Sequence, residues 1–266
     1  MAEYKHTVNA DGRTLNFHFP KSWQELTQRQ LKAVLVFLSA YDNTTALLRI
    51  TLFFANTVIV EKKGGTAICR VATDKGIMTV NFTAEDLLAL TEAMQWVMEP
   101  GAYPVLLDVL GGRKAIDKFL HGVPFETYIM LDNLFQGYLM SQNPEAIVEM
   151  ANYMYREPAT VDDGDWDYEA PAERITVLKP YELFSVVQWY TQLKALFVKE
   201  FSNFFKRVDG GTKPSVRDAM NAQIRALTGG DVTKEEQILA IDTWRALTEL
   251  DAKALEAEEF KKSMNR

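Results

Sequence analysis

Alternation of apolar and polar residues opens the chain and predicts a β-hairpin over residues 3–19. Leu15, Phe17 and Phe19 fall on one face of the second strand, while Asn16 and His18 fall on the other. An Asp-Gly pair ends the intervening turn and is a strong signal for a tight connection between antiparallel strands. We therefore expect a hairpin with one apolar face.

A second group of short runs is rich in β-branched residues and predicts a small meander. The runs cover residues 58–61, 67–72 and 77–82, and Gly-containing turns separate them. Three strands joined in this way could pair with the N-terminal hairpin.

Apolar residues spaced three and four apart predict helices along most of the remaining chain. Residues 101–122, which proline and a glycine pair interrupt, fit no regular element. The pattern indicates an α+β fold that is mainly α, with an N-terminal β-hairpin and a small β-meander beside a multi-helix body. The expected helices cover residues 23–41, 44–56, 83–97, 124 onward, 144–155, 180–207, 215–227 and 234–262.

Two capping boxes follow one another where the hairpin gives way to the first helix. Ser22 with Glu25, and Thr27 with Gln30, each have the spacing in which a hydroxyl accepts from an amide and the longer side chain reaches back. Pro20 ends the preceding strand because it cannot donate to a ladder. This is the most distinctive stretch of the chain.

Residues 157–172 mark the clearest shift in composition. They include six acidic residues, two prolines and no basic residue, which is typical of an exposed loop or linker. We expect an N-terminal mixed α/β part over residues 1–156, an acidic loop over 157–173 and a helical part over 174–266. The first and last parts could form one domain.

The overall composition indicates a globular protein that buries a core, because 47% of its 266 residues are apolar. The net charge is −7, so no basic footprint suggests nucleic acid or an anionic membrane as a partner. The most apolar run, residues 46–60, is too short and polar to span a bilayer. With one cysteine and no apolar leader, we expect a cytoplasmic protein in a reducing compartment.

Searches for catalytic and phosphate-binding motifs give no candidates. The glycine pairs at 64–65, 111–112 and 210–211 lack the spacing of known phosphate-binding loops. Arg113 and Lys114 follow the second pair and could hold an anion at a helix start, although an ordinary turn is the simpler interpretation. We expect no catalytic residues, no cofactor and a non-enzymatic protein.

Metal sites are equally unsupported. The three histidines stand far apart, and Cys69 fits a buried thiol in a strand. Asp163, Asp165 and Asp167 imitate the start of a calcium loop, but Tyr168 and Arg174 replace the required Gly and Glu. We expect no metal.

Two features suit the binding of another protein. Trp166 and Tyr168 stand within the acidic segment, where they either anchor a partner or fold back and hold the segment. The last helix has an apolar first half, in which Trp244, Leu247 and Leu250 either dock a partner or pack in the core. These five residues are the candidate protein-binding residues.

Three parts of the sequence resemble tail-region proteins of bacteriophages and prophages, particularly those of Bacteroidetes hosts. The first is residues 17–31 (FHFPKSWQELTQRQL), and the second is residues 151–156 (ANYMYR), followed by an acidic insert. The third is residues 224–235 (IRALTGGDVTKE), which lead into residues 242–247 (DTWRAL). Such proteins look like tail assembly chaperones.

The resemblance implies a factor in the cytoplasm of a bacterial host that binds the tape-measure or tail tube protein. It would keep the helical tape-measure protein from aggregating until tube subunits polymerise around it. The first alternative is a structural virion protein of the tail or neck. The second is an enzyme of unrecognised type, whose catalytic groups would converge from distant segments. The sequence leaves the oligomeric state open.

Overall fold

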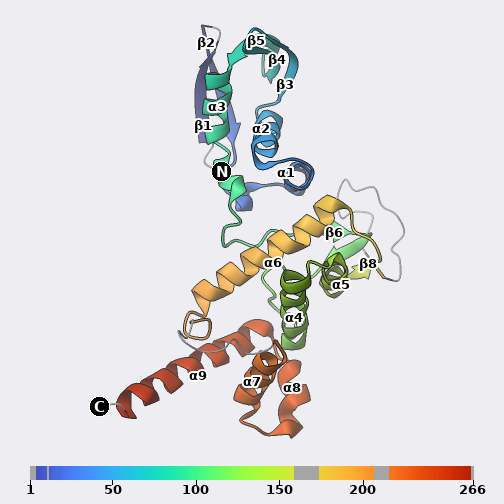
Figure 1. The fold of residues 1–266 in the computed structure, drawn as a ribbon, viewed down its shortest axis with the longest axis vertical. Helices are drawn as coiled ribbons and strands as arrows, with labels where there is room; N and C mark the ends of the chain where they lie inside the picture. The colour runs from blue at the N-terminus through green and yellow to red at the C-terminus, as the bar shows by residue number, and fades with distance from the viewer. Residues whose placement is uncertain (1–3, 11, 159–173, 207–215, 265–266) are drawn as a thin grey trace. The chain divides into compact units, whose positions relative to one another are not determined.

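The computed structural model describes residues 4–10, 12–158, 174–206 and 216–264. Its contacts divide the chain into two compact units, unit 1 (Met1–Pro100) and unit 2 (Gly101–Arg266). The fold is α+β and mainly α, as the sequence pattern predicts (Figure 1).

Unit 1 holds the predicted hairpin and meander as two separate antiparallel sheets. The hairpin comprises β1 (Tyr4–Ala10) and β2 (Arg13–Phe19), which pair so that Val8 lies opposite Leu15. The meander has the order β3–β4–β5, with β3 (Thr57–Lys63), β4 (Thr66–Thr73) and β5 (Gly76–Thr83).

The predicted faces of β2 are confirmed. Leu15, Phe17 and Phe19 are buried, while Asn16 and His18 are exposed. The apolar face of the hairpin belongs to the core of unit 1, to which helices and the meander also contribute buried side chains such as Leu35, Ile50, Phe82, Leu90 and Met94.

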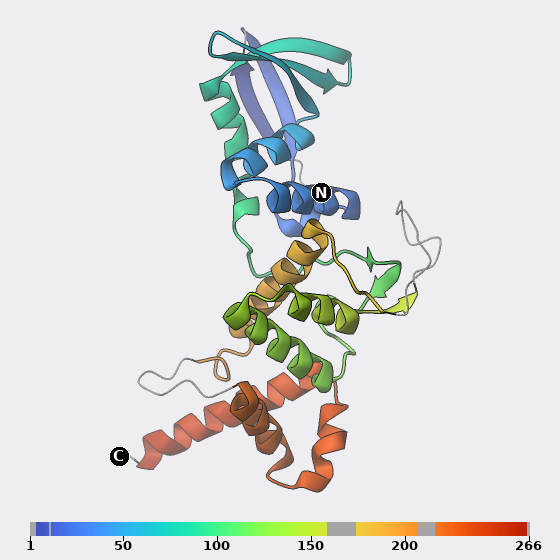
Figure 2. The same ribbon diagram turned by 45° about the vertical axis from the view of Figure 1, so that its right-hand side comes forward.

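The helices of unit 1 follow and flank these sheets. They are η1 (Trp23–Glu25), α1 (Gln28–Ala40), α2 (Asn43–Phe54), α3 (Ala84–Glu92) and η2 (Gln95–Met98). Figure 2 shows α3 running alongside the hairpin, where it contacts β1 and also β5. The expected helix over 83–97 is therefore two elements.

One of the two predicted capping boxes forms. The Thr27 hydroxyl accepts from the Gln30 amide at 3.3 Å, and the Gln30 side chain accepts from the Thr27 amide at 2.9 Å. The prediction for Ser22 is wrong, because its hydroxyl caps no backbone amide among the described residues. Glu25 instead accepts from the amide of Lys21 at 2.9 Å, one residue before the expected position.

A pair of tryptophans joins the segment after the hairpin to the last residues of unit 1. Trp23 Nε1 donates to the Glu99 carbonyl at 3.1 Å, and Trp96 Nε1 donates to the Pro20 carbonyl at 3.0 Å. Their rings meet edge to face with centroids 5.4 Å apart. The distinctive stretch around Trp23 thus has a structural role in unit 1.

Unit 2 consists of helices and one small sheet. The sheet has β6 (Val109–Leu110), β7 (Arg113–Ala115) and β8 (Tyr155–Pro158), so residues 109–115 are strands that the sequence pattern did not predict. The helices are α4 (Phe125–Ser141), α5 (Pro144–Met154), α6 (Pro180–Glu200), α7 (Val216–Thr228), η3 (Val232–Lys234), α8 (Glu235–Leu239) and α9 (Thr243–Met264).

The core of unit 2 includes residues from both sides of the acidic segment. Tyr128 of α4, Trp189 and Phe197 of α6, and Leu247 of α9 belong to one cluster of buried side chains. The division of the chain into compact units therefore falls after Pro100 and not within residues 157–173. The physical reason is that α4 and α5 bury their apolar faces with α6 and α9.

The expected helix over 234–262 is broken at residues 240–242. There the chain pairs with residues 122–125, as Thr243 donates its amide to the Val123 carbonyl at 2.9 Å and Phe125 donates to the Ile241 carbonyl at 2.8 Å. Asp242 accepts from the Arg245 amide at 3.1 Å and from the Gly122 amide at 2.6 Å. Asp242 thus replaces Thr233 as the cap of the last helix.

Candidate protein-binding groove

Three of the five candidate binding residues lie in or against the core of unit 2. Leu247 and Leu250 are buried, and Trp244 packs against the same cluster. Trp166 and Tyr168 lie outside the described residues. Docking of a partner directly on Leu247 does not fit its burial, because the side chain is enclosed by its own unit.

Trp244 fastens the first turn of α9 to the loop before α4. Its Nε1 donates to the Phe119 carbonyl at 2.6 Å, and its ring stacks on His121 with centroids 4.6 Å apart. Phe197 of α6 and Phe201, which directly follows this helix, meet the same indole edge to face. The sequence left two roles open for Trp244, core packing and docking of a partner. In the structure Trp244 packs against the core.

A groove of about 420 Å³ lies between α7, α9 and the turn after α6. Ala219, Ala222 and Ala226 form its wall on α7, at a spacing that places them on one side of that helix. Small side chains leave this space open because they do not fill the distance to the facing helix. The remaining lining residues are Phe204, Gln223, Leu250, Lys253 and Ala254.

Leu250 has both of the roles considered for the last helix, since it packs in the core and also lines the groove. It is almost fully buried, with 3% of its surface exposed, yet it contributes to the lining of the groove. Lys253 and Ala254 follow it one turn later on the same side of α9.

Asp251 holds the backbone of the segment from which Phe204 lines the groove. Its Oδ1 accepts from the backbone amides of Asn203 and Phe204 at 2.8 and 2.9 Å, and its Oδ2 accepts from the Asn203 side chain at 2.8 Å. These bonds satisfy amides that follow the end of α6. The backbone at Phe204, whose side chain lines the groove, is thus tied to α9.

The second half of α9 continues beyond the groove and presents apolar side chains to solvent. Leu255, Phe260 and Met264 are 42%, 65% and 72% exposed, and Figure 1 shows this half of the helix extending outward to the C-terminal end. Lys206 and Lys262 both donate to Glu258, which lowers the pKa of that carboxyl to about 2. The pair with Lys206 links α9 to the segment after α6, whereas Lys262 lies on α9 itself.

A second cluster, of ionisable groups, lies between α4 and α6. Asp132 accepts from Lys194 and from the Tyr190 hydroxyl, and Lys194 also approaches the Tyr128 hydroxyl. Burial raises the pKa of Tyr128 to about 12 and that of Tyr190 well above its usual value. Burial would lower the pKa of Lys194, but Tyr128 and Asp132 outweigh it and the pKa is raised. Both hydroxyls and the ammonium keep their protons at neutral pH, so the cluster is suited to holding two helices together.

Other candidate groups for chemistry are separated or enclosed. No group of three metal-binding side chains occurs in the described part of the chain. Cys69 is buried, and burial raises the pKa of its thiol. The pair Gly111 and Gly112 forms the turn between β6 and β7, where both residues have positive φ angles, so the anion site at a helix start is not formed there. Every helix in the described residues falls short of the length and apolar character needed to cross a bilayer.

Comparison of the chain with protein-family models, curated proteins and solved structures finds no match.

Proposed function

We propose that this chain is a non-enzymatic assembly factor of the phage tail type, which acts in the bacterial cytoplasm. Its client is a helical segment of the tape-measure or tail tube protein. The observation that carries the proposal is the apolar groove between α7 and α9, beside the exposed apolar end of α9. The resemblance to tail-region proteins supports the choice of client, since its third block includes Ala226 of the groove and the first turns of α9.

The shape and lining of the groove favour a helix as the occupant. An amphipathic helix docks by inserting side chains from positions three and four apart into an apolar trough. The alanines of α7 allow the two backbones to approach closely, and Leu250 and Phe204 provide apolar surface on the other walls. Lys253, which pairs with Glu249 one turn earlier on α9 at 3.3 Å, supplies a cation that an acidic residue on the polar side of the client can share.

The first experiment is a pull-down of the tagged chain from cells that express the neighbouring genes, with mass spectrometry of the bound fraction and of purified particles. We expect tape-measure or tube protein in the bound fraction and the chain to be missing from finished particles. Stoichiometric presence in particles would instead indicate a structural virion protein. Absence of both proteins from the bound fraction would contradict the proposed client.

Two substitutions on the same helix then test the groove itself. Ala254→Glu places a carboxylate in the groove, whereas Ala252→Glu places it on the exposed surface of α9. Burying an unpaired charge costs more than about 1.4 kcal/mol, so Ala254→Glu should weaken client binding at least about tenfold. The Ala252→Glu control should bind as the unchanged chain does. Equal binding by both variants would place the client elsewhere.

A further inference from the structure

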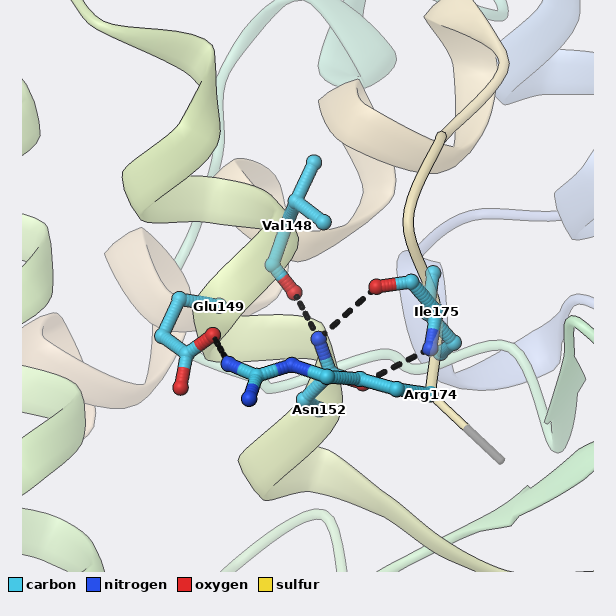
Figure 3. A network of polar contacts seen from close by, with 5 residues as sticks. All are labelled: Val148, Glu149, Asn152, Arg174 and Ile175. Atoms are coloured by element: carbon cyan, nitrogen blue, oxygen red, sulfur yellow. Dashed lines mark hydrogen bonds and ion pairs between the residues drawn. The ribbon is translucent and has the colours of Figure 1, made fainter. Parts of the chain in front are cut away.

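A second hollow of unit 2, of about 290 Å³, lies on α5, β7 and β8, and its arginines are all engaged by groups of the same chain. Asn152 accepts from the Ile175 amide at 2.8 Å and donates to the carbonyls of Ile175 and Val148, as Figure 3 shows. Arg174 pairs with Glu149 in the same network. These contacts hold the segment before α6 against α5. The second half of α9 differs, because its apolar side chains are largely uncovered.

An apolar stripe runs along α9 from the groove to the last turn of the helix. Leu250 and Ala254 line the groove, and Ala257, Phe260 and Met264 follow at the spacing of three and four residues that places side chains on one side of a helix. Leu250 is buried, whereas Phe260 and Met264 are 65% and 72% exposed. The stripe is thus covered at its start and open at its end.

The chain cannot cover the open end of this stripe with its own groove. Phe260 lies ten residues beyond Leu250 on one continuous helix, and a rise of about 1.5 Å per residue separates the two positions by about 15 Å. The groove and Phe260 keep this separation as long as α9 stays helical. A groove of this kind can therefore receive Phe260 only when it belongs to another molecule.

We propose that the groove and the end of α9 are reciprocal surfaces through which two copies of this chain associate. The end of α9 of one copy enters the groove of the other, and a twofold axis makes the two contacts identical. The two α9 helices run antiparallel, with Phe260 of each copy against the small side chain of Ala254 of the other. A large side chain opposite a small one fills the space that the alanines of the groove leave.

The charges beside the stripe suit this antiparallel arrangement. Lys253 borders the groove, and Glu256 follows three residues later on the same side of α9. Each Lys253 then meets Glu256 of the other copy, and Glu256 forms no ion pair with any residue that the structure describes. Lys253 pairs with Glu249 of its own helix at 3.3 Å, but this contact is exposed and weak, so the ammonium can share a second carboxylate.

This association rests on the groove of the proposed function but not on the client. A second copy occupies the groove until a client helix displaces it, so self-association and client binding are alternatives at one site. The dimer therefore keeps both apolar surfaces out of water when no client is present. Because a groove of about 420 Å³ in each copy is a small interface, we expect weak association in the micromolar range.

Sedimentation velocity of the full chain over a series of concentrations, without other proteins, tests the proposal. We expect a monomer at low concentration and a dimer at high concentration. Phe260→Glu places a carboxylate against the groove of the other copy and should raise the dissociation constant at least about tenfold. Leu255→Glu is the matched control, because Leu255 lies on the same half of α9 outside the stripe and is 42% exposed, and it should leave the dissociation constant unchanged.

Two charge reversals separate association from loss of folding. Lys253→Glu and Glu256→Lys each place like charges opposite each other in both contacts of the dimer, so each variant alone should dimerise more weakly. When the two variants are mixed, both contacts of the mixed dimer join opposite charges again, and dimerisation should be restored. Neither unfolding nor a contact within one chain can produce a dimer that forms only on mixing.

A monomer at every concentration, equal dimerisation of Phe260→Glu and the unchanged chain, or no restoration on mixing would overturn the proposal. Assemblies larger than a dimer would also contradict the closed twofold arrangement. The pull-down measures client binding separately. A monomer that captures the client would leave the proposed function standing, whereas a dimer that captures no client would leave the association standing.

Discussion

Lys194 Nζ lies 2.9 Å from Asp132 Oδ1 and thereby joins α6 to α4 within unit 2. The two side chains are only 23% and 22% exposed, so water compensates little of the charge on either. The Tyr190 hydroxyl donates to the same oxygen at 2.8 Å. The pair is thus part of a partly buried polar network that links the two helices.

We expect Asp132→Asn to lower the free energy of unfolding by about 2 kcal/mol, because it leaves the Lys194 ammonium without its counter-charge. Urea denaturation measures the change. A double variant with Lys194→Met as well should recover part of the loss, since the remaining charge is removed. Additive losses in the double variant would show that the two groups are not coupled.

The raised pKa of Tyr128 predicts a loss of stability at alkaline pH. Burial raises this pKa from its ordinary value of 10.0 to about 12, so the unfolded chain releases the proton first. The contribution of this group is fully present below pH 10 and decreases between pH 10 and about 12, at up to about 1.4 kcal/mol per pH unit. Denaturation across this range should show a shallower decline in Tyr128→Phe; an unchanged slope would contradict the prediction.

The two hydroxyl residues at the start of the helical region should differ in their effect on stability. Thr27→Ala removes a formed capping box and should cost about 1 kcal/mol. Ser22→Ala is the matched control, because the Ser22 hydroxyl caps no amide in the described structure, and it should change stability by less than about 0.5 kcal/mol. Thermal denaturation of both variants compares them directly, and equal losses would mean that both boxes form in solution.

Two leucines of α9 separate the core role of this helix from its surface role. Leu247→Ala should destabilise the chain by about 2–5 kcal/mol, since Leu247 is fully buried and leaves a cavity. Leu255→Ala, at a position 42% exposed, should cost much less than Leu247→Ala because most of that side chain is already in water. Chemical denaturation measures both. A small loss for Leu247→Ala would be inconsistent with its place in the core.

The groove could be traced in the sequence only in part. Ala219, Ala222 and Ala226 have a helical spacing that places small side chains on one side of α7. The same spacing of alanines is equally typical of two tightly packed helices. Whether space remains depends on the residues opposite, which come from α9 and from Phe204. A second hollow, whose lining includes Arg113, Arg156 and Arg174, has the same origin, because these arginines lie on three separate stretches of the chain.

The break before α9 shows why the bounds of a helix are harder to predict from the sequence than the presence of the helix. Thr233 and Glu236 fit a capping box, and the apolar spacing runs through residues 240–242 without interruption. The pairing of this segment with residues 122–125 ends α8 at Leu239, and α9 begins at Thr243 with Asp242 as its cap. A long-range contact thus overrides the local preference.

The sequence by itself determined the elements whose signals are local. The Asp-Gly turn and the alternation of β2 define the hairpin, Thr27 and Gln30 define the start of α1, and Pro144 opens α5, because each depends on residues within a few positions. Only the tertiary structure decided which helices share a core, where the boundary between the units falls and which side chains line the two hollows. Those outcomes depend on side chains that meet across tens of residues, and packing between distant segments has no counterpart in the local pattern.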